Sequence, residues 1–165
     1  MWLSSTAQQA LHAVLCIAGS ESEGPVRVDE IAATIDCPRN YLSKTLHALT
    51  LAGVLRSERG PRGGFRLAGA ADRLALATVI APFERVGERR CLLGRPTCGD
   101  ANPCAAHQRW RTLAGGMETF FRTTTIAQLL RENPRAAEET REGIRSARHP
   151  NARKPHGPVR RRSAG

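Results

Sequence analysis

Three cysteines and one histidine fall close together in the second half of the chain, at Cys91, Cys98, Cys104 and His107. Six residues separate the first two cysteines, five separate the next two, and His107 follows Cys104 by three positions, a spacing that shares one face of a helix. Thiolates and an imidazole can hold either a tetrahedral zinc ion or an iron–sulfur cluster. The spacing alone leaves zinc, a cluster and plain thiol chemistry open.

The remaining cysteines and bases indicate no catalytic centre. Cys16 lies in an apolar stretch and is expected to be a small core residue, and Cys37 receives no role. A cysteine-dependent redox enzyme would need a nucleophile beside a base, and Cys104 with His107 is the one such pair in the sequence. We therefore expect no enzyme and no small-molecule substrate.

The first half of the chain contains the elements that must position these three cysteines and His107. The order of these elements predicts a winged helix-turn-helix. Helical periodicity follows a capping-box spacing at Ser5 to Gln8, and two short helices come next. Two strand-like segments around a Gly-rich turn then form a hairpin, the wing. The expected helices span residues 5–18, 28–35 and 38–52, the strands span 54–58 and 65–67, and a further helix contains Leu76 to Phe83. The expected fold class is therefore mostly α, with a small two-stranded β wing.

The second helix of the helix-turn-helix has a polar, basic outer face, which is typical of a helix that enters the major groove of DNA. Residues 56–66 of the wing hold four Arg and one Glu, so the wing is suited to phosphates or a narrow minor groove. A plain three-helix bundle with a solvated face is the alternative. The predicted DNA-binding residues are Arg39, Asn40, Tyr41, Ser43 and Lys44 on the helix, and Arg59, Arg62, Gly63 and Gly64 on the wing.

A long C-terminal dimerisation helix is expected to start at Asn102-Pro103, with apolar residues at spacings of four and three from Ala106 onwards. Two heptads are too short for a free coiled coil, so we expect this helix to pack against its copy in a homodimer. An ordinary core helix is the alternative. The predicted dimer contacts are Trp110, Leu113, Met117, Phe120 and Phe121, with residues 126–130 extending them.

The charge of the chain indicates an anionic partner. Lys and Arg number 25 and Asp and Glu number 15 among 165 residues, which gives a formal net charge of +10. Ten of these basic and four of these acidic residues lie in residues 131–165, where apolar residues are scarce, so we expect a disordered basic tail that attracts DNA without reading its sequence. Seven aromatic residues are too few for a single-strand stacking platform. No apolar run approaches the about 20 residues of a membrane span, so we expect no membrane contact. The apolar stretch 11–18 has no preceding Lys or Arg and no convincing cleavage site, unlike a signal peptide, so we expect a cytoplasmic protein.

These expectations divide the chain into four parts. Residues 1–84 form the DNA-binding domain, 85–102 the cysteine-rich loop, 103–130 the dimerisation helix and 131–165 the tail.

Four features together resemble the IscR/NsrR-type iron–sulfur transcription regulators. They are Ala10-Leu11-His12 in the first helix, Tyr41-Leu42 in the second helix of the helix-turn-helix, the wing run 59–65, and a three-cysteine loop before a long helix. The resemblance covers residues 1 to about 130. It implies a homodimeric regulator, in most members a repressor, that binds a double-stranded DNA operator. It also implies that the protein senses iron–sulfur status, nitric oxide or redox state.

The resemblance further implies a ligand set. Cys91, Cys98 and Cys104 would bind a [2Fe–2S] or [4Fe–4S] cluster, which the resemblance favours over zinc. His107 is the first choice for the fourth ligand, and His12 of the partner subunit is the second; the acidic ligand of other branches corresponds to Gln8, a poor ligand for iron. The expected function is a DNA-binding repressor whose affinity depends on its cluster. A regulator with a structural zinc or a thiol switch is the alternative.

Overall fold

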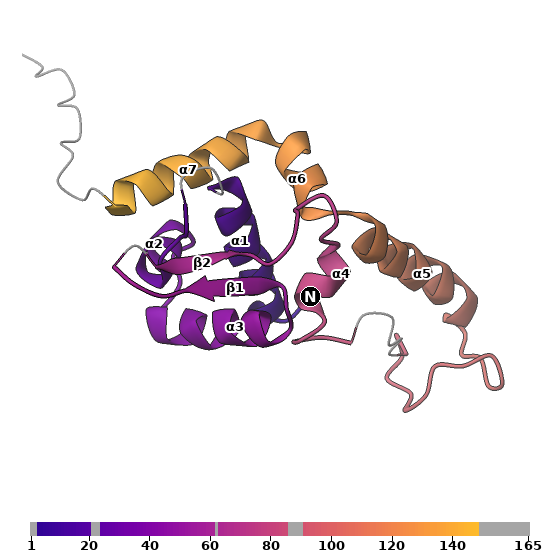
Figure 1. Cartoon of the computed structure of the whole chain (residues 1–165). Coiled ribbons are helices and arrows are strands. Elements are labelled where there is room, and N and C mark those ends of the chain that lie inside the picture. Colours follow the sequence, from indigo (N-terminus) through magenta and orange to yellow (C-terminus); the bar gives the residue numbers. More distant parts are fainter. Residues whose placement is uncertain (1–2, 21–23, 62, 86–90, 149–165) are drawn as a thin grey trace, which may run out of the picture.

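The computed structural model of the chain describes residues 3–20, 24–61, 63–85 and 91–148 (Figure 1). Within these residues the fold is mostly helical with one two-stranded antiparallel sheet, which confirms the expected fold class. None of the helices found there is long and apolar enough to cross a lipid bilayer. In chain order the elements are α1 (Ser5–Gly19), α2 (Val28–Thr34), α3 (Arg39–Leu51), β1 (Leu55–Glu58), β2 (Gly64–Leu67), α4 (Leu76–Ile80), α5 (His107–Thr123), α6 (Ile126–Glu132) and α7 (Pro134–Arg148).

Helix α1 is the central element of the domain. The Ser4 hydroxyl caps it by accepting a hydrogen bond from the backbone of Ala7, so the cap lies one residue before the predicted position. Its buried positions are mostly small or branched apolar residues, including Ala10, Ala13 and Val14, all without solvent exposure. Small side chains let neighbouring helices approach closely, and α1 contacts α2, α3, α4, α6, α7 and β2. Cys16 belongs to this core, as expected.

The helix-turn-helix consists of α2 and α3. Asp36 in the turn has a positive φ of 49°, a conformation that Asp tolerates better than most residues. The amide of Cys37 then donates to the Ala32 carbonyl at 3.0 Å and closes the turn. Leu42, Leu46 and Leu49 place one face of α3 in the core, without exposure, and the opposite face is left to solvent. The predicted leucine stripe therefore sets which face of α3 can meet a partner.

The wing is the hairpin of β1 and β2, in which Leu55 pairs with Leu67 and Glu58 pairs with Gly64. Val26, just before α2, adds a bridge to Phe65, and their amides and carbonyls exchange hydrogen bonds of 3.0 and 2.8 Å. This bridge makes Gly64 necessary, because a Cβ there would lie 2.6 Å from the Val26 carbonyl oxygen. The wing is thus held by the segment that leads into the helix-turn-helix.

The predicted helix over residues 103–130 is wrong as a single element, because it is divided into α5 and α6. Thr124 and Thr125 are extended, and Thr125 forms a bridge with Ala75, fifty residues earlier in the chain. Thr125 also caps α6 in a capping box with Gln128. The start is later than predicted too, since α5 begins at His107 after a turn. Ile126 is fully buried in the core of its own chain and does not extend a dimer contact.

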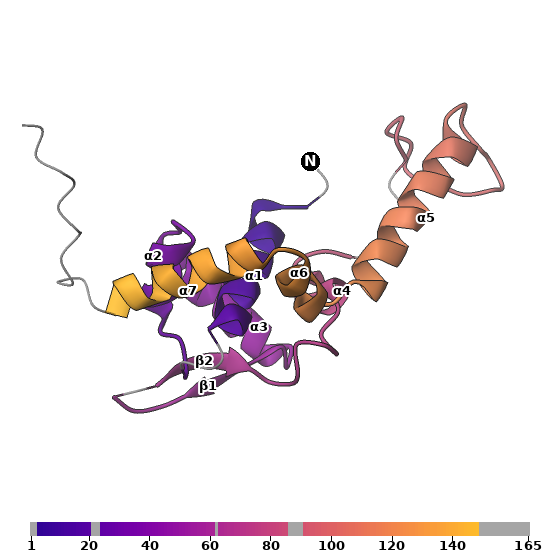
Figure 2. The same cartoon turned by 90° about the horizontal axis from the view of Figure 1, so that it is seen from above.

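The expected disordered tail is also wrong for residues 131–148, because α6 ends at Glu132 and α7 follows it. Helix α7 lies across α1 and α2 (Figure 2). Ile144 is fully buried, the Arg141 guanidinium donates to the Gly19 carbonyl at 2.7 Å, and Gly143 faces Thr34 so closely that a Cβ would lie 2.9 Å from its methyl group. Among the described side chains of α7, a buried Ile144, a hydrogen bond from Arg141 and a close contact at Gly143 attach a helix whose composition is strongly polar. Residues 149–165 lie outside the described part of the chain.

Replacing Ile144 by Ala should lower the free energy of unfolding by about 2–5 kcal/mol, because it removes a fully buried side chain and leaves a cavity. Urea denaturation followed by circular dichroism measures this change. The matched control is Ser146→Ala, an exposed position on the same helix, which should change stability little. Equal stability of the two variants would show that α7 does not stabilise the domain.

Candidate functional site

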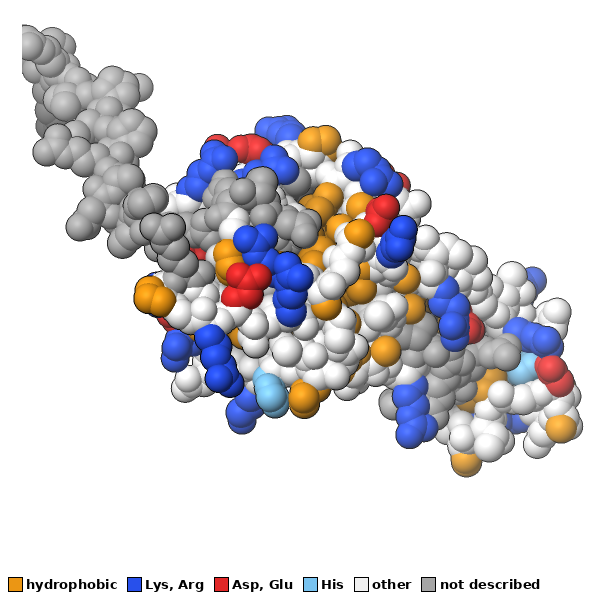
Figure 3. Space-filling view, in the orientation of Figure 1, with side chains coloured by type: hydrophobic (Ala, Val, Ile, Leu, Met, Phe, Trp, Pro, Cys, Tyr) orange, Lys and Arg blue, Asp and Glu red, His pale blue; other side chains and the backbone are white. Residues whose placement is uncertain are grey.

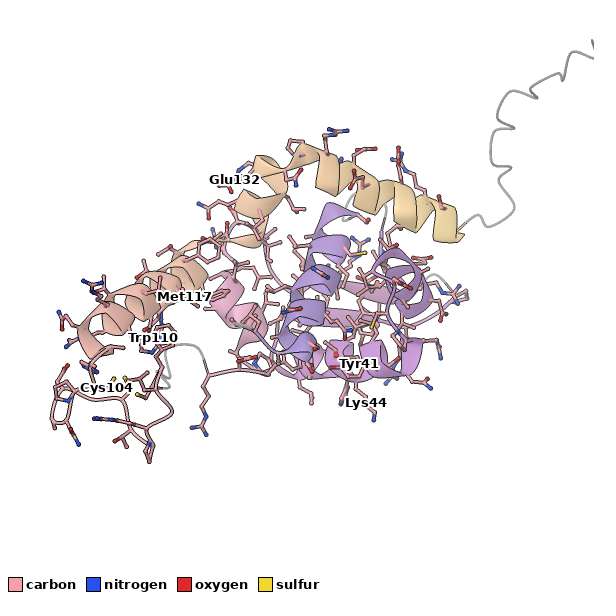
Figure 4. The ribbon with its side chains drawn as sticks, turned by 180° about the vertical axis from the view of Figure 1, so that it is seen from behind. Tyr41, Lys44, Cys104, Trp110, Met117 and Glu132 are labelled. Carbon is pink, nitrogen blue, oxygen red and sulfur yellow. The ribbon has the colours of Figure 1, made fainter. Side chains whose placement is uncertain are left out.

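The predicted ligands lie on the segment of residues 91–106, here called the cysteine loop, and at the start of α5. They form two pairs: Cys91 Sγ lies 3.7 Å from Cys104 Sγ, and Cys98 Sγ lies 3.7 Å from His107 Nδ1. The three loop cysteines are free thiols and partly exposed. Cys104 lies far from Tyr41 and Lys44 on α3 (Figure 4). The loop and the helix-turn-helix therefore occupy separate parts of the molecule.

The backbone around Cys91 is arranged for a thiolate. The amides of Arg95 and Leu93 donate hydrogen bonds to the Cys91 thiol, and together with Cys104 and the Arg95 charge they lower its pKa. A turn that Gly94 closes, with a φ of 74°, brings these amides round to the sulfur. The thiolate is the form of cysteine that binds metal ions, so the lowered pKa of Cys91 favours a cation at this end of the loop.

His107 is held from two sides. Its ring is buried, with 6% of the residue exposed, and it is the only buried residue of α5. Its Nε2 lies 2.9 Å from Asp100 Oδ1, and Arg111 Nη1 lies 2.6 Å from the same oxygen. The hydrogen bond from His107 and the Arg111 charge lower the pKa of Asp100. Asp100 and Arg111 have no signal in the sequence, because their pairing depends on the path of the loop.

The three thiols and the imidazole have the right chemistry for a metal centre, and they lie in two pairs. Among the described residues no three His, Cys, Asp or Glu groups converge on one point. Each pair on its own fits one tetrahedral metal, since ligands at about 2.0–2.3 Å from such an ion lie about 3.3–3.8 Å from each other. The structure therefore brings the four predicted ligands together two by two.

The other candidate residues lie away from the cysteine loop. His12 is exposed on α1, and Gln8 is occupied by a hydrogen bond from its side-chain amide to the Leu3 carbonyl. Cys16 and Cys37 are buried. Burial raises the pKa of Cys16 to about 12 and also raises that of Cys37, so neither is a reactive thiol. A role for His12 across a dimer stays a prediction.

The outer face of α3 provides side chains for DNA, although some already have partners. Arg39 forms an ion pair with Asp29, the Tyr41 hydroxyl bonds that of Thr6, and the Ser43 hydroxyl donates to the Arg39 carbonyl. Asn40 and Lys44 are exposed and have no hydrogen bond or ion pair to any described residue. These two side chains are the ones most available to a base edge or a phosphate.

In the wing, too, some of the basic side chains already have ion-pair partners. Arg56 and Arg66 pair with Glu58 at 3.8 and 3.2 Å, so their charges are partly neutralised. Arg59 is exposed and makes no ion pair with the described residues, and Arg62 lies outside them. Basic side chains lie over α3 and the wing in Figure 3, and others lie over α7 and along α5 on the same face. The two glycines predicted to bind DNA, Gly63 and Gly64, are also required by packing within the chain. A Cβ on Gly63 would lie 2.3 Å from the Glu58 carbonyl oxygen.

The family of the chain follows from a direct comparison. The family described as "Rrf2: Iron-dependent Transcriptional regulator" matches residues 3–132, most of the chain. The chain belongs to the Rrf2 family. This Rrf2 protein is also 31% identical over 133 residues to the HTH-type transcriptional regulator IscR of Vibrio atlanticus, a match that covers 81% of this chain and 77% of that protein. The resemblance to IscR-type regulators is thereby confirmed, and the relatives are regulators rather than enzymes.

Solved structures show the same fold. The global cysteine regulator CymR of B. subtilis superposes with a TM-score of 0.69 at 21% identity, covering 80% of this chain and 98% of that one. IscR of T. potens gives a TM-score of 0.66 at 21% identity, covering 82% and 90%. These likenesses establish the winged-helix architecture of this Rrf2 protein. The family match ends at residue 132, so α7 lies beyond it.

Helix α5 of the Rrf2 protein projects away from the rest of the domain (Figures 1 and 2). Leu113 and Phe120 are 53% and 50% exposed, unusual values for such apolar side chains. Trp110 and Met117 are partly buried, and Phe121 packs partly against the core of its own chain. The structure thus leaves part of the predicted dimer face open and assigns Phe121 mainly to the chain's own core.

Proposed function

We propose that this Rrf2 regulator is a dimeric repressor that acts in the cytoplasm and senses its signal through an iron–sulfur cluster on the cysteine loop. Binding of DNA and regulation of transcription come from its family. The observation that carries the finer proposal is the gathering of Cys91 with Cys104 and of Cys98 with His107, each at 3.7 Å. Four side chains that can ligate iron lie as two close pairs in the cysteine loop and at the start of α5.

The division into two pairs supports a [2Fe–2S] cluster. In such a cluster each iron takes two protein ligands, whereas in a [4Fe–4S] cluster each iron takes one. Cys91 and Cys104 would hold one iron, and Cys98 and His107 would hold the other. A single zinc ion would require all four groups to converge, and the described donors lie in separate pairs.

The cysteine loop is placed to act on the DNA-binding elements. A cluster supplies a group whose oxidation, nitrosylation or loss changes the charge and the ligation of the loop. Cys104 lies three residues before the start of α5, α5 packs on α4, and α4 packs on α1. Release of Cys91 and Cys98 would free the loop, move α5 and so change the spacing of two DNA-reading heads in a dimer. A hundredfold change in affinity needs about 2.7 kcal/mol of coupling.

The role of the thiols can be tested by colour. Protein purified anaerobically should absorb visible light and contain iron and sulfide, because a thiolate-bound cluster is coloured, and Cys98→Ala should lose that absorption. Cys37→Ala is the matched control, since it removes a thiol outside the loop and should keep the colour. A wild-type protein that stays colourless after anaerobic reconstitution with iron and sulfide would contradict the proposal.

A second copy of the chain is the partner that fits α5. Apolar residues on an exposed helix favour burial against another apolar surface, and the heptad spacing of Leu113 and Phe120 matches a parallel or antiparallel copy of the same helix. A dimer also suits duplex DNA, because two reading heads can meet two half-sites.

Replacing Leu113 by Glu should convert the dimer to a monomer, because a charge would be buried in an apolar contact. Sedimentation velocity measures the mass, and circular dichroism checks that the helix content is kept. Gln108→Glu, a charge change at an exposed position of the same helix, is the control and should leave the dimer intact. A monomeric wild-type protein, or a dimeric Leu113→Glu variant, would refute the proposed interface.

DNA recognition is proposed for the exposed face of α3 and the wing. Asn40 and Lys44 would face the major groove, where an Asn side chain suits adenine, with Arg39, Tyr41 and Ser43 beside them. Arg59 would reach a phosphate or the minor groove. In this arrangement Gly63 and Gly64 shape the hairpin that presents Arg59.

Arg59→Ala should weaken binding to duplex DNA and reduce the slope of log K against log salt by about 0.9, the value for one lost phosphate contact. Fluorescence anisotropy at several salt concentrations gives both quantities. Arg135→Ala on α7 is the matched control, because it removes the same charge away from the proposed surface. If both variants change the affinity and the slope equally, the wing is not part of the interface.

A thiol switch is the second candidate function, and the Cys91–Cys104 pair favours it. The two sulfurs lie 3.7 Å apart, and a disulfide requires about 2.05 Å, so a small loop movement would join them. With hydrogen peroxide as oxidant, the two thiols would lose two protons and two electrons, and the peroxide would become two waters. A reversible disulfide in a protein that holds no iron after reconstitution would favour this function over the cluster.

A further inference from the structure

His107 at the cysteine loop has a second hydrogen-bond partner besides the predicted ligand Cys98. Both ring nitrogens of this buried histidine have a partner, since Nδ1 lies 3.7 Å from Cys98 Sγ and Nε2 lies 2.9 Å from Asp100 Oδ1. Asp100 is only two residues after Cys98, so the loop contacts the ring on two edges. The imidazole is therefore fixed in its orientation about the start of α5.

The partners decide which nitrogen carries the proton. A carboxylate oxygen only accepts hydrogen bonds, and a neutral imidazole has one N–H and one lone pair. The contact with Asp100 therefore places the N–H on Nε2 and leaves the lone pair of Nδ1 directed at Cys98. The nitrogen beside Cys98 is thus the one whose lone pair would be available to a metal ion held there.

Arg111 keeps the carboxylate in place. It follows His107 by four residues, which is one turn of α5, and its Nη1 lies 2.6 Å from the same Oδ1 that receives the histidine proton. The Asp100 side chain is 68% exposed, so solvent would let it rotate away without these two donors. One carboxylate oxygen consequently joins the cysteine loop to the first two turns of α5.

We propose that Asp100 is a positioning residue for the cluster site, which fixes the tautomer and orientation of His107 while Arg111 holds it against α5. The ligand role of Nδ1 rests on the proposed function, whereas the tautomer and the docking of the loop do not. A metal-bound histidine commonly donates its other N–H to a carboxylate, and loss of that partner typically weakens metal binding about 10–100-fold.

The tautomer can be measured in the reduced, metal-free chain. Long-range ¹H–¹⁵N spectra at about pH 8, where an ordinary imidazole is neutral, should show His107 with its proton on Nε2 and protected from exchange with water. His107→Gln assigns the signal. Asp100→Ala should lose the protected proton, and Asp100→Asn should retain it because its amide oxygen still accepts. The exposed residue Asp72 gives the matched control, Asp72→Ala, which should change nothing.

Binding of Co²⁺ alone, followed by its visible absorption, gives the second readout. Asp100→Ala should raise the dissociation constant about 10–100-fold, and Asp100→Asn should recover part of the loss. An unchanged Nε2–H signal in Asp100→Ala, or a proton on Nδ1 in the wild type, would overturn the inference. A wild type that binds neither Co²⁺ nor a cluster would instead contradict the proposed function, while the spectra would still decide the role of Asp100. Arg111→Ala gives an independent check. It keeps the Asp100 carboxylate but removes the second donor that holds it, so the Nε2–H of His107 should be less protected from exchange with water.

Discussion

Three backbone hydrogen bonds join residues 124–127 of this Rrf2 protein, at the junction of α5 and α6, to residues 71–76, at the start of α4. The amide of Leu76 donates to the Thr124 carbonyl at 3.0 Å, the amide of Ile126 donates to the Leu74 carbonyl at 2.9 Å, and the amide of Ala127 donates to the Ala71 carbonyl at 3.1 Å. Leu76 and Ile126 are both buried, so the joint has an apolar interior as well as paired backbone. Helix α5 packs on α4, so this joint and the α4–α5 contact both connect α5 to the rest of the domain.

This arrangement lets one small chain keep the proposed sensing site apart from the proposed DNA-binding surface. Helix α3, strand β2 of the wing and α4 all contact α1, so a displacement of α4 would reach α3 and the wing through α1. The cysteine loop has few contacts of this kind. Its order comes instead from amides that face Cys91 and from the carboxylate that links His107 to Arg111. Such polar, partly exposed contacts can be made and lost at a low cost in free energy.

The parts of the fold that local patterns determine could be predicted from the sequence. The Leu42, Leu46 and Leu49 stripe defines the exposed face of α3, and the glycines of the wing match a hairpin whose backbone comes close to Val26. The fold class and the family followed from these patterns and the cysteine loop. The spacing also named the four side chains that the structure brings into two pairs.

Contacts between distant parts of the chain account for the errors. The division between α5 and α6 depends on the bridge between Thr125 and Ala75, which the apolar periodicity of the helix does not reveal. Helix α7 was missed because its composition is polar, while its attachment depends on Ile144 and on a glycine facing Thr34. The contacts of the Asp100 carboxylate could not be predicted for the same reason, since its two partners lie seven and eleven residues further along the chain.

The central claim is that the occupant of the cysteine loop controls DNA binding. The most direct measurement is an anaerobic titration of one duplex, selected by the protein from a random-sequence pool, with cluster-loaded protein and with the same protein stripped by a chelator. The account predicts at least a tenfold difference in dissociation constant, which corresponds to about 1.4 kcal/mol of coupling. Equal affinities of the loaded and stripped proteins, both dimeric and folded, would contradict it.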